Sequence, residues 1–149
     1  KERTSARRCS FSLSSAGSCF MAYNPNIEKL VAEARGVFLA SVDKNDGEIG
    51  GGWYDLGRCL AAMHLRCKGA DEFEKHCETI GIAPRTGYYI VATYRVFFRL
   101  RIKPPDGISW RKLGELVPIL RWENREKLFR LCREHPREEI VEIVKNWRW

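Results

Sequence analysis

The segment that most constrains the fold is residues 71–99, which has the pattern of a helix, a tight turn and a second helix. Its first part carries apolar residues at three- and four-residue intervals, the spacing of one helical face. These residues are Phe73, Cys77 and Ile80. Gly81 gives the backbone the freedom that a turn needs, and Pro84 suits the first helical position, where its missing N–H would be unpaired anyway. The pattern predicts a helix-turn-helix.

The helix that opens at Pro84 has two faces of opposite character. An inward stripe at the 3.6-residue period consists of Gly87, Ile90, Val91, Tyr94, Phe97 and Phe98. The opposite face consists of Arg85, Tyr88, Ala92, Arg95 and Arg99 and contains no acid. Such a face is typical of a solvated helix, but it could also lie in a DNA groove, where guanidinium groups meet phosphates or guanine edges.

A strand is the alternative for residues 95–103, because this run contains β-forming residues that partly alternate with polar ones. The helical period, however, extends over the whole segment from Gly87, whereas the alternation covers its end alone. We therefore expect a helix there.

The length and charge of the chain favour one folded unit with an anionic partner. At 149 residues it can bury a core without metal or disulfide support. It has 26 Lys and Arg against 19 Asp and Glu, a net charge of +7. Nucleic acid is the commonest partner of a basic domain, although solubility alone explains many such proteins.

Apolar runs and cysteines bear on the compartment. No run approaches the roughly 18 residues that a membrane span needs, so no membrane partner is expected. The six cysteines are sparse and no signal-peptide core precedes them. We expect a cytoplasmic protein with reduced thiols.

The whole chain is predicted to be all-α, a multi-helix bundle that contains the helix-turn-helix. Residues 1–22 are Ser-rich and basic and are expected to form a disordered arm. Residues 23–103 would form the helical domain, and residues 104–149 a helical extension packed on the same core. Apolar periodicity and capping residues predict the remaining helices at 53–68, 110–120, 123–135, 136–149 and about 25–42. Asn24 and Pro25 are the expected start of the last of these ranges.

Metal and catalytic sites are not expected. Several candidate metal ligands are close in sequence: Cys59, His64, Cys67, His76 and Cys77. Their spacing is irregular, and Cys67 and Cys77 fall on inward faces, where a free cysteine behaves as a small apolar residue. None of the three histidines has a nucleophile and an orienting acid nearby in the sequence. We expect no enzyme, no cofactor, no metal and no small-molecule substrate.

The order of motifs resembles a helix-turn-helix module of bacterial plasmid, phage and other mobile-element proteins. The first motif is Trp53, Leu56, Gly57, Arg58 and Leu60, and the second is Phe73, Glu74 and Cys77. The third runs through Gly81, Ile82, Ala83, Pro84, Arg85, Thr86, Gly87 and Tyr88. A later run is also similar: Trp110, Lys112, Leu113, Leu116, Pro118, Leu120, Glu123 and Asn124. Ala83 and Gly87 depart from the module's usual Ser and Ala. The likeness spans residues 53–124 and implies DNA binding.

Two functions follow as hypotheses. The first is a noncatalytic binder of double-stranded DNA, a regulator or a replication, partition or packaging accessory, which would act as a homodimer. Its base contacts would come from Arg85, Thr86, Tyr88 and Tyr89, and its backbone contacts from Arg95, Arg99 and Arg101. The alternative is an all-helical adaptor that binds a protein partner and no nucleic acid.

Overall fold

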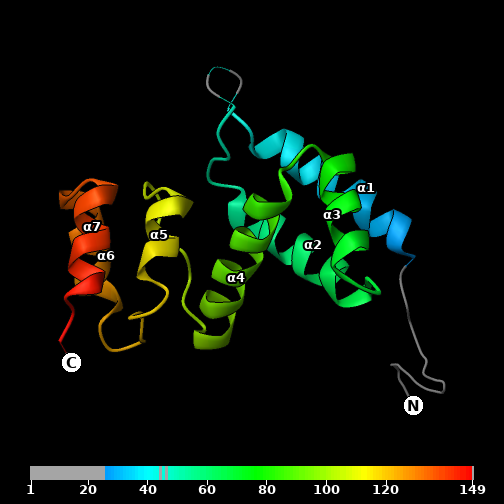
Figure 1. Ribbon diagram of the computed structural model, residues 1–149. Helices are drawn as coiled ribbons and strands as arrows, with labels where there is room; N and C mark the ends of the chain where they lie inside the picture. The colour runs from blue at the N-terminus through cyan, green and yellow to red at the C-terminus, as the bar shows by residue number, and fades with distance from the viewer. Residues whose placement is uncertain (1–25, 44, 46, 149) are drawn as a thin grey trace, which may run out of the picture.

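The computed structural model describes residues 26–43, 45 and 47–148, and this part of the chain is helical throughout its regular structure (Figure 1). The helices are α1 (Ile27–Ser41), α2 (Trp53–Arg66), α3 (Ala70–Ile80), α4 (Pro84–Leu100), α5 (Trp110–Leu116), α6 (Arg125–Glu134) and α7 (Arg137–Lys145). The described residues contain no named strand, and a single antiparallel bridge joins Val42 to Ile49. The predicted all-α fold is confirmed. The predicted arm, residues 1–22, lies outside the described residues.

The α3–turn–α4 unit lies where the sequence predicts it. Gly81 ends α3 in the left-handed region, with φ 108°. Its N–H donates to the Glu78 carbonyl at 3.1 Å, and the Ile82 N–H donates to the Cys77 carbonyl at 2.9 Å. These two bonds satisfy carbonyls that a helix end otherwise leaves unpaired, and they set the direction of the turn. α4 continues to Leu100, so residues 95–100 are helical.

Helix α4 lies between the group formed by α1, α2 and α3 and the group formed by α5, α6 and α7 (Figure 1). It packs closely on α2 because Gly57 carries no side chain. A Cβ atom at Gly57 would lie 2.6 Å from the Cβ of Tyr94, closer than two carbons can approach. Gly57 therefore sets the spacing of the α2–α4 contact.

Aromatic rings connect α4 to both groups. The Phe97 ring is fully buried, with its centroid 5.7 Å from that of Trp53 in α2 and 6.2 Å from that of Phe129 in α6. At the other end of α4, the Tyr89 ring packs edge-on against Trp110 of α5 at 5.5 Å. One continuous hydrophobic core thus includes residues from α1 to α7.

Several details differ from the sequence-based expectation. The first helix begins at Ile27, because the Asn26 side chain accepts the Glu28 N–H at 2.8 Å and caps it. The last two helices are shorter than predicted, since they begin at Arg125 and Arg137 and end at Glu134 and Lys145. Phe98, assigned above to the inward stripe, is 63% exposed. Phe98 lies in the last turn of α4 and borders a pocket at that end of the helix, and the periodicity of one helix does not show where its neighbours stop covering it.

Candidate nucleic-acid interface

The outer face of α4 is a row of cationic side chains. Arg85, Ala92, Arg95 and Arg99 are all exposed. At about 100° per residue they fall within a sector of about 80°, and Arg85 and Arg99 are about 21 Å apart along the helix axis. None of these arginines forms an ion pair with an acid within the described residues. We call Arg85, Arg95 and Arg99, together with Arg101 just beyond the helix, the arginine row.

Arg101 has an unusual backbone conformation. It ends α4 with φ 59° and ψ 37°, and it is the one non-glycine residue of the described chain with a positive φ. Its N–H donates to the Phe98 carbonyl at 3.1 Å, and the next residue, Ile102, donates to the Phe97 carbonyl at 3.0 Å. This is the helix ending that Gly81 gives α3, where glycine avoids the steric cost of the left-handed region. Arg101 bears that cost.

Arg95 contacts a histidine. Its Nη2 lies 3.2 Å from Nδ1 of His64 on α2. Burial and, secondarily, the Arg95 charge lower the pKa of His64. The lowered pKa favours the neutral imidazole, whose Nδ1 can then accept from the guanidinium. The contact orients Arg95 without neutralising its charge.

Tyr88 lies in the same sector of α4 but leans toward α3. Its hydroxyl donates to a carboxylate oxygen of Glu74 at 3.2 Å, and its ring packs against Phe73 with centroids 4.8 Å apart. The phenol is half-buried. Any contact of Tyr88 with a base would have to break this hydrogen bond.

Tyr89 and Thr86 lie away from the arginine row. Burial, followed by the charge of Glu115, raises the pKa of Tyr89, whose hydroxyl lies beside Glu115 and Arg137. Thr86 borders a small pocket of about 150 Å³ together with Gly81 and other residues. Of the seven residues assigned from the sequence, Arg85, Arg95 and Arg99 share the outer face of α4 and Arg101 is exposed just beyond its end, whereas the side chains of Thr86, Tyr88 and Tyr89 face other parts of the protein.

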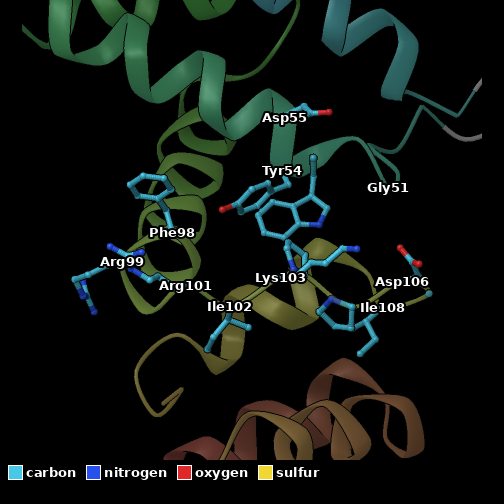
Figure 2. Close-up of a pocket in the computed structure, with 14 residues that line it drawn as sticks. Gly51, Tyr54, Asp55, Phe98, Arg99, Arg101, Ile102, Lys103, Asp106 and Ile108 are labelled. Atoms are coloured by element: carbon cyan, nitrogen blue, oxygen red, sulfur yellow. The ribbon is translucent and has the colours of Figure 1, made fainter. Parts of the chain in front are cut away.

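A larger pocket of about 880 Å³ lies at the end of the arginine row, between the first turn of α2 and the segment after α4 (Figure 2). Arg99 and Arg101 border one side of it, and Asp106 lies on the opposite side in this view. Sequence reasoning missed Lys103 and Tyr54, which also line it. The two prolines after Lys103 could have indicated this pocket, because they end the helical run and turn the chain back toward α2.

A second group of polar side chains meets at the corner between α2 and α3. Cys67, at the end of α2, lies close to Glu72 and His76 of α3, and their ligand-type atoms are all within 4.8 Å of one another. The sequence pointed to Cys67 and His76 as neighbours in the chain, but not to Glu72. Cys67 is half-exposed and not buried as its place in the periodic pattern predicted.

Comparisons with known proteins complete the description. No family model, no curated protein and no solved structure matches this chain. The resemblance of residues 53–124 to a helix-turn-helix module therefore depends on the motifs quoted above. None of the helices in the described part of the chain has both the length and the apolar content needed to cross a bilayer.

Proposed function

We propose that this protein is a noncatalytic binder of double-stranded DNA that uses the arginine row of α4. The observation that carries the proposal is the exposure of Arg85, Arg95 and Arg99 on one face of α4, with exposed Arg101 just beyond its end, and none of the four has an acidic partner among the described residues. Phosphate contacts by such residues supply most of the affinity in protein–DNA complexes.

The other helices show what an ordinary solvated face looks like in this chain. Each of the other six described helices contains at least one Asp or Glu, and in α6 and α7 acids and bases are interspersed. α4 contains none in 17 residues. A face selected for solubility alone gains nothing from excluding acids, whereas a face that approaches phosphates does, because a carboxylate there would repel the ligand.

The backbone of Arg101 adds a second line of support. A non-glycine residue in the left-handed region costs roughly 1–2 kcal/mol, and glycine would serve the same cap. Strain of this kind persists where the side chain has a use. Arg101 is exposed just beyond the last turn of α4, where it borders the same pocket as Arg99.

The dimensions fit a duplex. The 21 Å estimated between Arg85 and Arg99 corresponds to about six base-pair steps at about 3.4 Å each. Arg85 is the second residue of α4, and the N-terminal residues of a recognition helix are those that reach base edges. We assign base contact to Arg85 and phosphate contact to Arg95, Arg99 and Arg101. Two copies of the chain would place two such helices on successive turns of the groove.

The test is a titration of fluorescent random duplex with the full chain over a salt series. The three arginines assigned to phosphate contribute about −2.7 to the slope of log affinity against log salt, about −0.9 each. Arg99→Ala is expected to reduce the slope by about 0.9. Arg58→Ala is the matched control, because Arg58 is an exposed arginine of α2 paired with Glu33 at 3.8 Å; its slope should equal that of the parent chain.

Two results would refute the proposal. One is the absence of duplex binding at low salt, which would leave the protein-binding adaptor as the surviving hypothesis. The other is an equal loss of slope in the Arg58 and Arg99 variants, which would show that net charge, and not the arginine row, is responsible. The mass of the complex in solution tests the homodimer.

A further inference from the structure

The corner between α2 and α3 brings a thiol, a carboxylate and an imidazole together. Cys67 is the residue that ends α2, and Glu72 and His76 are one turn apart on α3. Their Sγ, carboxylate and ring nitrogen atoms lie within 4.8 Å of one another. All three residues are half-exposed, so the cluster can be reached from solvent.

One atom of this cluster makes no hydrogen bond. Nε2 of His76 is buried and has no hydrogen-bond partner among the described residues. A carboxylate oxygen of Glu72 is 3.6 Å away, within the range of an ion pair with a protonated imidazole but beyond hydrogen-bonding distance. Buried polar atoms are nearly always satisfied in folded proteins, so an orphan ring nitrogen aimed at a carboxylate needs an explanation.

A tetrahedral cation explains the spacing. Zinc bonds of about 2.1 Å to nitrogen and oxygen place the two ligand atoms about 3.4 Å apart, close to the observed 3.6 Å. Cys67 Sγ would need to approach by at most about 1 Å to complete a zinc–sulfur bond of about 2.3 Å. A rotation of its half-exposed side chain supplies such a movement.

The carboxylate is already oriented for this role. One oxygen of Glu72 accepts the backbone N–H of Lys68 at 2.7 Å, which leaves the other oxygen facing His76. A hydrogen bond of this kind fixes the ligand before the metal arrives. The mixture of thiolate, imidazole and carboxylate is one that zinc accepts, and hard cations such as magnesium do not take thiolate ligands.

A second histidine–glutamate pair in the protein serves as a comparison, because it has no metal-type cluster around it in the part of the chain that the structure describes. His135 Nδ1 lies 2.7 Å from Glu139, also four residues away, and the two are hydrogen-bonded to each other. No cysteine joins that pair in any candidate metal-binding group of the described residues. The two pairs have the same sequence spacing and differ in the open geometry and in the thiol.

We propose that Cys67, Glu72 and His76 bind one zinc-class divalent cation, with a fourth position open to water. The bound cation joins the end of α2 to α3 and so fixes the corner that precedes the α3–turn–α4 unit. The proposal does not depend on DNA binding. It differs from the sequence-based expectation because the ligands come from two helices at spacings that match no common zinc motif.

The experiment is a titration of the full, reduced and chelator-treated chain with Co²⁺, followed by displacement with Zn²⁺. One equivalent of Co²⁺ should give visible bands of a tetrahedral site and a thiolate-to-cobalt charge-transfer band, and Zn²⁺ should abolish both. Cys67→Ser should lose the charge-transfer band, and His76→Gln should weaken binding at least tenfold. His135→Gln and the double variant Cys9→Ser/Cys19→Ser are the matched controls and should bind as the parent chain does.

A measurement without any variant guards against misfolding of the substituted chains. Zinc should protect Cys67 of the parent chain from alkylation, as read by mass spectrometry of its peptides, and should raise the melting temperature. The proposal is overturned if no charge-transfer band forms, if Cys67→Ser retains it, or if zinc leaves the alkylation rate of Cys67 unchanged.

Discussion

Replacement of Arg101 by glycine separates the two properties that this residue combines. Arg101 ends α4 in the left-handed region and is exposed at the end of the arginine row. Glycine relieves a backbone cost of roughly 1–2 kcal/mol but loosens the unfolded chain by about 0.4–1 kcal/mol. The net expectation is a gain in the free energy of unfolding of about 0.5–1 kcal/mol, or a melting temperature higher by about 1–4 °C.

The affinity of Arg101→Gly for DNA should fall while its stability rises. One lost phosphate contact removes about 0.9 from the salt slope, which at about 0.1 M salt is an affinity roughly eightfold weaker. The difference between Arg101→Gly and the parent chain should shrink as salt approaches about 1 M. A more stable protein that binds DNA less tightly is thus the expected outcome.

Arg101→Ala is the comparison that isolates the backbone. It removes the same side chain and keeps the left-handed conformation strained, so its affinity should fall as far as that of Arg101→Gly without the gain in stability. Thermal denaturation and duplex anisotropy measured on the same samples give both quantities. A glycine variant that melts lower than the parent chain would refute the assigned backbone strain, and one that binds duplex equally well would remove Arg101 from the interface.

Three further outcomes are expected from the packing and ionisation of the core. Gly57→Ala should destabilise the fold by about 1–3 kcal/mol, because the new Cβ forces α2 and α4 apart by about 1 Å; Gly36→Ala, with no atom within 4 Å of its Cβ, should instead stabilise it by about 0.5–1 kcal/mol. Equal thermal shifts in the two variants would contradict the close α2–α4 contact. In metal-free native protein, iodoacetamide should modify half-exposed Cys67 before Cys77 and Cys132, because burial raises the pKa of Cys77 to about 12 and that of Cys132 to about 11; peptide mass spectrometry that found Cys132 modified first would count against the core position of α6. Since burial raises the pKa of Tyr89 above its ordinary 10, the unfolded chain loses this proton first, so stability is full below about pH 10 and falls as pH rises beyond it. Denaturant unfolding at about pH 9 and pH 11 should show a smaller alkaline loss in Tyr89→Phe, and an unchanged loss would mean that the phenol is not the group responsible.

Local signals predicted the helices well because they act within one or two turns. Gly81 and Pro84 placed the turn between α3 and α4, and Ser109, a residue type favoured at the N-cap, caps α5 by accepting the Arg111 N–H at 3.1 Å. The end of α4 was harder. Arg101 adopts the left-handed conformation, which its residue type disfavours, and no pattern of side chains predicts where a non-glycine residue does so.

The sequence predicted which charged residues of the candidate site are exposed, but not which residues its tyrosines contact. Helical spacing alone put Arg85, Arg95 and Arg99 on one outer face, and they are exposed there. The same spacing could not tell that Tyr88 would lean toward Glu74, or that Tyr89 would pack on Trp110, because those partners come from other helices. The metal-type cluster was missed for the same reason, since it forms where two helices meet at a corner.

The central place of α4 has a consequence for how such a protein could change its target. Its inner residues hold two groups of helices together, so they cannot vary without cost to the whole fold. The outward positions 85, 92, 95 and 99 are all exposed, and Ala92 lies in the middle of them. New side chains at these few positions would alter what the surface recognises while the architecture beneath stays the same.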